Sequence, residues 1–199
     1  MDVYVYKYCG NTYINLTNRC NNDCDFCIRH NSDELAGSNL WLKKEPEAED
    51  VIAALKSSGM SDEVVFCGYG EPTLRLDVLK KVAEFIKSTG RKVRINTNGL
   101  ANAYYERNIA PELKGLADTV SISLNAPNAE KYDSVCHSIY GIKAFNYLLG
   151  FTRDCVNEGI DTVLTVVDVI PGSDIEICRQ IAQRCGARLR VRTLITDNN

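Results

Sequence analysis

The alternation of apolar and polar positions along the chain predicts short strands and amphipathic helices in regular succession. Strand patterns cover residues 4–6, 13–16, 63–67, 92–97, 119–124, 162–170 and 188–194. Helical spacing of apolar residues covers residues 51–59, 76–86, 101–113, 144–156 and 174–185. The first two strands flank Cys9-Gly10-Asn11, a turn signal, so a hairpin is expected at about residues 3–17.

Strand and helix alternate from residue 13 onward, which predicts a parallel sheet with helices outside it. The pattern gives a single α/β domain over residues 1–199, built from six βα units. Six units are too few for a complete eight-stranded barrel, so we expect a partial (β/α)6 barrel, with an open doubly wound sheet as the alternative. Both architectures place the active site at the carboxyl ends of the strands.

Composition narrows the class of protein. The chain has 199 residues, 45% of them hydrophobic and 25% charged, with a formal net charge of −3. These are ordinary values for a globular domain, and no basic cluster is large enough to indicate nucleic acid. No apolar run approaches the roughly 18 residues of a membrane span, and Asp2 stands where a signal peptide is basic. We therefore expect a cytoplasmic protein that has no membrane attachment.

The nine cysteines are many for such a chain, and their odd number argues against a disulfide framework. Three of them, Cys20, Cys24 and Cys27, form a C-x3-C-x2-C motif in a polar segment at about residues 18–40, which is expected to be a long functional loop. The other six are expected to be small buried residues: Cys9, Cys67, Cys136, Cys155, Cys178 and Cys185.

Three closely spaced thiolates suit an iron–sulfur cluster. A [4Fe–4S] cluster has four irons, so three cysteine ligands keep one iron open for a small molecule. His30 follows Cys27 closely, so a tetrahedral zinc site of three cysteines and one histidine is an alternative. Ligand chemistry alone therefore leaves three classes open: a cluster enzyme, an iron–sulfur electron carrier and a zinc-stabilised binding module.

With Phe26 at its aromatic position, the cysteine motif resembles the signature of the radical S-adenosylmethionine (radical SAM) superfamily. The resemblance implies that Cys20, Cys24 and Cys27 hold a [4Fe–4S] cluster, that the open iron binds S-adenosylmethionine, and that Phe26 lies near its adenine. Residues 14–20, Ile-Asn-Leu-Thr-Asn-Arg-Cys, make the chain most similar to a small group of radical SAM proteins named for their association with TatD-type nucleases.

A glycine-rich turn, Gly68-Tyr69-Gly70-Glu71-Pro72, follows the strand at residues 63–67. Glycine lets backbone approach a ligand closely, and a carboxylate such as Glu71 accepts hydrogen bonds from a cationic amine. The turn resembles the Gly-Gly-Glu element of the same superfamily, with Tyr69 where many members have glycine. The resemblance implies that Glu71 holds the methionine amino group.

The remaining strand ends carry further residues that the resemblance assigns to S-adenosylmethionine. Asn96, Thr97 and Asn98 stand at a Thr-Asn-Gly turn, and Ser123 and Asn125 stand where family members contact the ribose or the carboxylate. The other assigned residues are Ile170, beside the adenine, and Arg192 and Leu194 at the last strand. Turn chemistry alone also favours several of these residue types.

The resemblance also implies the reaction. An external one-electron donor reduces the cluster, S-adenosylmethionine is cleaved reductively, and the resulting 5′-deoxyadenosyl radical abstracts hydrogen from a substrate. The chain ends almost at its sixth core strand, so we expect the mouth of the barrel to be closed by a macromolecular substrate or partner, such as a protein or peptide.

Overall fold

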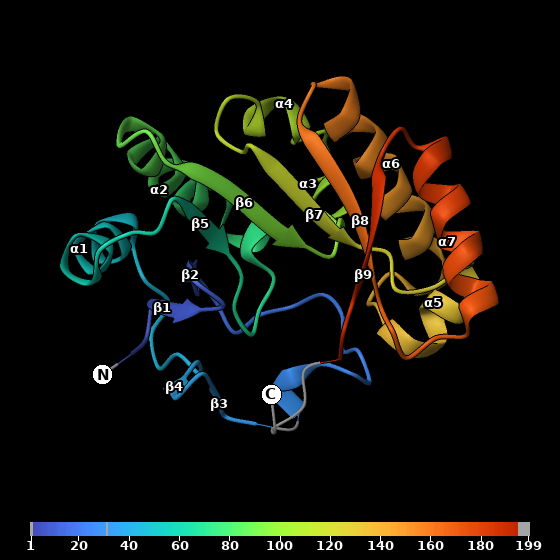
Figure 1. Ribbon diagram of the computed structural model, residues 1–199, viewed down its shortest axis with the longest axis horizontal. Helices are drawn as coiled ribbons and strands as arrows, with labels where there is room; N and C mark the ends of the chain where they lie inside the picture. Colours follow the sequence, from blue (N-terminus) through green and yellow to red (C-terminus); the bar gives the residue numbers. More distant parts are fainter. Residues whose placement is uncertain (1, 31, 195–199) are drawn as a thin grey trace.

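The computed structural model describes residues 2–30 and 32–194. Its centre is a curved seven-stranded sheet in the order β1-β2-β5-β6-β7-β8-β9, with helices covering the outer, convex side (Figure 1). Strands β1 (Val5–Tyr8) and β2 (Asn11–Ile14) form the expected antiparallel hairpin. All other neighbouring strands in this sheet are parallel, which confirms the predicted α/β class and the partial barrel.

The core strands after the hairpin lie close to the predicted positions: β5 (Glu63–Phe66), β6 (Lys92–Thr97), β7 (Thr119–Ser123), β8 (Asp161–Val167) and β9 (Arg188–Arg192). The helices are α1 (Ala48–Ser58), α2 (Leu76–Ser88), α3 (Ala101–Tyr105), α4 (Ala110–Leu113), α5 (Ala129–Cys136), α6 (Ala144–Asn157) and α7 (Gly172–Arg184). The long loop carries a second small hairpin, β3 (Glu34–Leu35) with β4 (Ser38–Asn39).

Two helix predictions differ from the structure. The single helix expected over residues 101–113 is interrupted, because Glu106 adopts a left-handed conformation after α3 and Pro111 stands in the first turn of α4. Helix α5 was not predicted, although Asn128 caps it by accepting a hydrogen bond from the Lys131 backbone. This helix has eight residues, and only Tyr132 and Cys136 are buried, so its sequence is too short to show a clear helical periodicity.

Successive side chains of each strand point to opposite faces of the sheet. On β6, Val93 and Ile95 are fully buried in the main hydrophobic core beneath the helices. Arg94 and Asn96 alternate with them and face the concave side. In the part of the chain that the structure describes, no helix combines the length and the apolar character needed to cross a bilayer.

Candidate active site

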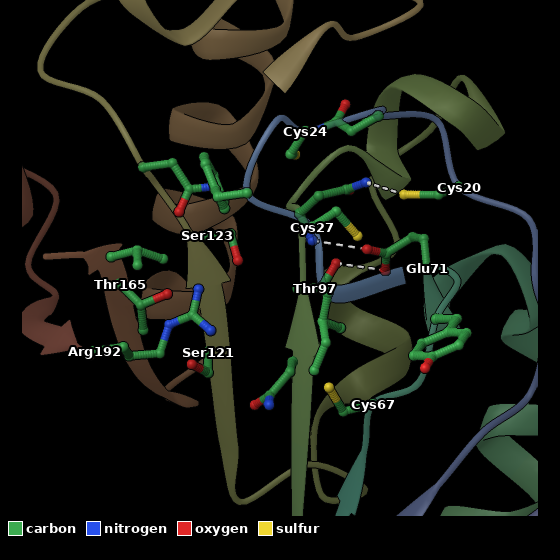
Figure 2. Close-up of a pocket in the computed structure, with 18 of the residues that line it drawn as sticks. Cys20, Cys24, Cys27, Cys67, Glu71, Thr97, Ser121, Ser123, Thr165 and Arg192 are labelled. Atoms are coloured by element: carbon green, nitrogen blue, oxygen red, sulfur yellow. Dashed lines mark hydrogen bonds between the residues drawn. The ribbon is translucent and has the colours of Figure 1, made fainter. Parts of the chain in front are cut away.

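A cavity opens at the carboxyl ends of the parallel strands, with the three cysteines of the motif on one side and Ser121, Ser123, Thr165 and Arg192 on the other (Figure 2). The structure brings nearly all the predicted site residues to this cavity: Cys20, Cys24, Phe26, Cys27, Gly68, Gly70, Glu71, Asn96, Thr97, Asn98, Ser123, Asn125, Arg192 and Leu194. Ile170 is the exception. It lies beyond the end of β8 and packs, half-buried, against the main core, so the adenine contact stays a prediction.

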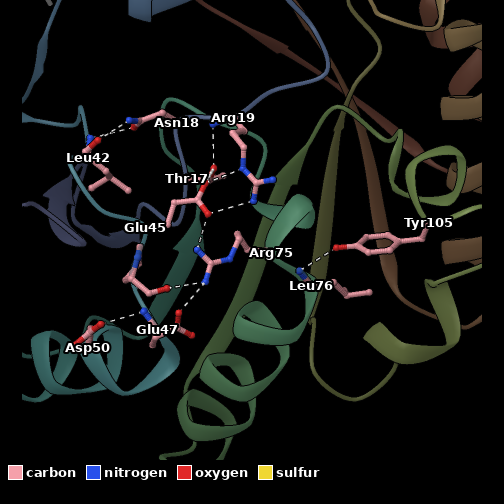
Figure 3. Close-up of polar contacts among 11 residues, drawn as sticks. Thr17, Asn18, Arg19, Leu42, Glu45, Glu47, Asp50, Arg75, Leu76 and Tyr105 are labelled. Atoms are coloured by element: carbon pink, nitrogen blue, oxygen red, sulfur yellow. Dashed lines mark hydrogen bonds and ion pairs between the residues drawn. The ribbon is translucent and has the colours of Figure 1, made fainter.

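The start of the cysteine loop is fastened by Glu45 (Figure 3). Its carboxylate accepts hydrogen bonds from Thr17 Oγ1 at 2.5 Å, Arg19 Nε at 2.8 Å and Arg75 Nη1 at 2.9 Å. Partial burial would raise the pKa of Glu45, but the hydrogen bonds from Arg19 and Thr17 and the nearby guanidinium charges hold it below its ordinary value. Glu45 therefore ties the loop to the segment before α2.

Helix α5 holds the middle of the same loop. The backbone amides of Asp23 and Asp25 donate to the carbonyls of Cys136 and Val135, at 3.0 and 3.1 Å. Asn22 Nδ2 also donates to the hydroxyl of buried Tyr132, at 2.9 Å. The last turn of α5 thus supplies carbonyl acceptors to a loop that has little regular structure of its own.

The three thiols of the motif are partly buried beside one another in the cavity wall. Burial raises the pKa of Cys20 to about 12 and also raises the pKa of Cys27. A hydrogen bond with Cys136, and then burial, raises the pKa of Cys24. Such thiols keep their protons at neutral pH until a metal displaces them.

This donor set fits an iron–sulfur cluster better than zinc. His30, the fourth ligand of the zinc alternative, does not line the cavity, and its Nε2 instead lies 2.9 Å from Asp23 Oδ1. Across residues 2–30 and 32–194, no group of three or more His, Cys, Asp or Glu side chains is arranged to hold a metal ion. A cubane, which takes one sulfur at each of three separate corners, does not need the tight convergence of a tetrahedral ion site.

The glycine turn packs directly on the lead-in to the cysteine loop. A Cβ on Gly70 would collide with the carbonyl oxygens of Thr17 and Arg19, and a Cβ on Gly68 would collide with the Asn15 side chain. The Glu71 amide donates to Arg19 O at 2.8 Å, which fixes this approach. The two glycines are therefore required by contact between the turn and the chain before Cys20.

Glu71 is 4% exposed and lies between the ends of β5 and β6. Its Oε1 accepts from Thr73 N at 3.1 Å, Thr73 Oγ1 at 2.6 Å and Thr97 Oγ1 at 2.7 Å. Among the described residues, Oε2 accepts only from Asn98 N, at 2.8 Å. Burial raises the pKa of Glu71, although these hydrogen bonds oppose the shift. Its Oε2 retains capacity for one more donor, such as a ligand amine.

Several polar atoms around the cavity are buried without a protein partner. Within the described residues, Asn96 Oδ1, Asn125 Oδ1 and Arg192 Nε form no hydrogen bond. Buried polar groups are nearly always satisfied, so this wall is shaped for a ligand that has both donors and acceptors. S-adenosylmethionine, with its amine, carboxylate and ribose hydroxyls, offers this combination.

Sequence reasoning missed some residues that shape the site. Ser121 and Thr165 line the cavity because they alternate with buried apolar residues on β7 and β8, a signal visible in the strand pattern. Glu45 and α5 had no comparable signal, because each acts through contacts with residues distant in the chain.

Comparison with known proteins agrees with this geometry. The family model of the radical SAM superfamily matches residues 14–185. The probable GTP 3′,8-cyclase of Metallosphaera sedula is 28% identical over 156 residues, which cover 75% of this chain and 44% of the relative. That of Saccharolobus islandicus is 30% identical over 151 residues, covering 74% and 44%. The chain thus spans less than half the length of these relatives.

Solved structures show the same fold. Streptococcus suis SuiB bound to its precursor peptide SuiA has a TM-score of 0.68 at 17% identity, covering 92% of this chain and 39% of that one. The FeFe-hydrogenase maturase HydG of Carboxydothermus hydrogenoformans has a TM-score of 0.64 at 19% identity, covering 92% and 44%. With the cysteine loop, the glycine turn and the family match taken together, the chain belongs to the radical SAM superfamily, whose enzymes use a [4Fe–4S] cluster and S-adenosylmethionine.

Proposed function

We propose that Cys20, Cys24 and Cys27 hold a [4Fe–4S] cluster in this cavity and that the chain cleaves S-adenosylmethionine reductively there. The supporting observation is that three thiols, the carboxylate of Glu71 and a set of unpartnered polar atoms line one cavity at the strand ends. When bound, the cluster and S-adenosylmethionine supply one-electron chemistry that produces a 5′-deoxyadenosyl radical, which takes a hydrogen atom from the substrate.

The residues of this chain bind and orient the cofactor. Glu71 Oε2 accepts from the methionine amine, and the hydrogen bonds from Thr73, Thr97 and Asn98 hold the carboxylate in place. Asn96, Ser123 and Asn125 contact the ribose and carboxylate, while Arg192 offers a guanidinium to the carboxylate. Phe26 and Leu194 give the adenine apolar contacts, and Gly68, Gly70, Thr97 and Asn98 shape the turns that bring these groups together.

The wider assignments are part of the same proposal. The electron comes from an external donor, and a peptide or protein closes the open side of the barrel. SuiB, which has the same fold, has been solved with its precursor peptide, and this supports a peptide substrate. The nine free thiols suit the reducing cytoplasm. The narrower resemblance to the TatD-associated group stays a prediction.

The decisive experiment is anaerobic. The protein is reconstituted with iron and sulfide, reduced and mixed with S-adenosylmethionine, and 5′-deoxyadenosine is then measured. We expect product from the wild type and none from Cys24→Ala, because a missing ligand removes one corner of the cluster.

Cys155→Ala is the matched control, since Cys155 is a free cysteine buried in the core away from the cavity. Bound zinc without acid-labile sulfide would contradict the cluster assignment. Turnover of a free small molecule by the isolated protein would contradict the peptide assignment alone.

A further inference from the structure

A second cavity of about 410 Å³, here called the inner chamber, lies within the curve of the sheet. Its walls carry the rings of Tyr6, Tyr8 and Tyr13 from the hairpin, with Leu35 and Leu40 from the long loop. The ring centroids of Tyr6 and Tyr13 are 5.3 Å apart, and those of Tyr8 and Tyr13 are 5.6 Å apart. The ring planes of Tyr6 and Tyr13 are tilted by 35°, and Tyr8 meets Tyr13 edge-on at 76°, so the three rings form a continuous aromatic wall that is not flat.

The inner chamber adjoins the cofactor cavity. The two share a wall that includes Cys67, Tyr69, Asn96, Arg190 and Arg192. A group bound in the inner chamber therefore lies next to the place where the proposed radical forms.

Three arginines face the inner chamber. Arg94 is 9% exposed, and its Nη2 lies 3.1 Å from Glu63 Oε2 and 3.4 Å from the Tyr13 hydroxyl. Its Nε is buried and has no hydrogen-bond partner in the part of the chain that the structure describes. Arg190 and Arg192 form no ion pair with any acidic side chain of residues 2–30 and 32–194. Among the described residues, Glu63 therefore pairs with Arg94, and the other two guanidinium groups of the chamber have no carboxylate partner.

Arg188, the first arginine of β9, differs from Arg190 and Arg192 in having an acidic partner. Arg188, at the start of the strand, is paired with Asp161 at 2.7 Å and lines neither cavity. Toward the carboxyl end, burial and then the nearby charge of Arg94 lower the pKa of Arg190, and burial lowers the pKa of Arg192. Arg192 is half-buried and Arg190 is exposed, and the like charges of Arg94, Arg190 and Arg192 lie close together, an arrangement that a bound anion stabilises.

We propose that the inner chamber binds an oxyanion of the substrate, a carboxylate or a phosphate, through Arg94 and Arg190, with the attached planar group against the tyrosine wall. Guanidinium groups bind both oxyanions through charge-assisted hydrogen bonds. The carboxylate of S-adenosylmethionine can pair with Arg192, and Arg94 and Arg190 are then available to the substrate. On a peptide, the oxyanion belongs to an acidic side chain or to the terminus. This inference rests on the proposed function and names the chemistry of its substrate.

The test measures binding to the anaerobically reconstituted enzyme, with S-adenosylmethionine present, by isothermal titration calorimetry. The probes are benzoate, phenyl phosphate and the neutral benzamide. We expect at least one of the two anions to bind about tenfold tighter than benzamide, and added salt to weaken that binding. A preference for benzoate identifies a carboxylate substrate, and a preference for phenyl phosphate identifies a phosphate ester.

The variants are Arg190→Gln and, as a matched control, Arg188→Gln on the same strand. Arg190 is exposed and has no ion-pair partner among the described residues, so its replacement leaves the core intact. We expect Arg190→Gln to weaken binding of the preferred anion about tenfold and Arg188→Gln to leave it unchanged. Arg94→Gln is expected to weaken it as well, but Arg94 is buried and paired, so the decision rests on Arg190.

Equal binding of benzamide and both anions, or equal effects of the two β9 variants, would overturn the oxyanion chamber. These outcomes are separate from the proposed function, which depends on formation of 5′-deoxyadenosine. Anion binding without cleavage of S-adenosylmethionine would overturn the proposed function and leave the chamber as an anion site. Cleavage of S-adenosylmethionine without a preference for anions would overturn the anion site and leave the proposed function in place.

Discussion

The two faces of the curved sheet differ although the same strands build both. On the convex face, Val93, Ile95, Val120 and Ile122 are fully buried beneath the helices. On the concave face, the residues that alternate with them are polar or charged, and they line the two cavities: Arg94, Asn96, Ser121 and Ser123. The strand period of two therefore separates the residues that stabilise the fold from those that meet ligands. Mutations on the two faces should have separable effects.

Substitutions in the core beneath the convex face should cause the largest loss of stability. Phe151 of α6 is fully buried, so Phe151→Ala should lower the free energy of unfolding by about 3–5 kcal/mol through lost contacts and a residual cavity. Urea denaturation measures this change. Formation of 5′-deoxyadenosine per bound cluster should stay near the wild-type value wherever the variant is folded, and a large loss would show that the two faces are coupled.

Substitutions on the concave face should change the affinity for ligands. Glu71→Gln removes a buried negative charge and directs an amide NH₂ toward backbone or hydroxyl donors. Affinity for S-adenosylmethionine should fall about 10- to 100-fold, which corresponds to the loss of a charged hydrogen bond. Calorimetry on reconstituted protein tests this, with Glu112→Gln as the control, because Glu112 pairs with Lys80 and Arg107 outside both cavities. Unchanged affinity would remove Glu71 from the cofactor site.

A substitution in the glycine turn at the strand ends is expected to affect both stability and cluster binding. Gly70→Ala forces a methyl group against the carbonyls of Thr17 and Arg19, so we expect a loss of about 1–3 kcal/mol in stability together with weaker cluster retention. Gly150 in α6 has open space around its Cα, so Gly150→Ala should be neutral or stabilise by about 0.4–1 kcal/mol. Iron content after gel filtration and urea denaturation report the two effects. Full iron retention by Gly70→Ala would contradict this account of the turn.

The smallest effect is expected at Glu45, which holds the loop from outside the cavity. Its pKa in the folded protein is below the ordinary 4.5, so its ion pairs stabilise the protein above pH 4.5 and are lost as the pH falls through the folded value. Near neutrality, Glu45→Gln should be less stable than wild type by about 0.5–1 kcal/mol, since a half-exposed pair is screened by solvent. This difference should vanish in acid, and a difference that grows there would contradict the assignment.

The sequence predicted most of the fold because helix and strand signals are local. Alternation identified β6, and helical spacing with a terminal glycine identified α2. The same reasoning failed where the signal was weak. Helix α5 has eight residues, too few for a clear period, and the end of α3 depends on the left-handed Glu106.

The candidate site divides in the same way. Cys20, Cys24, Cys27 and the glycine turn are contiguous motifs, so the sequence alone determined the chemistry they offer and the strand ends at which they stand. Only the tertiary structure decided that α5 and Glu45 hold the cysteine loop, that Ile170 lies away from the cavity, and that Arg94 and Arg190 face one chamber. These depend on contacts between residues far apart in the chain, which form only when the sheet curves and which no local pattern records.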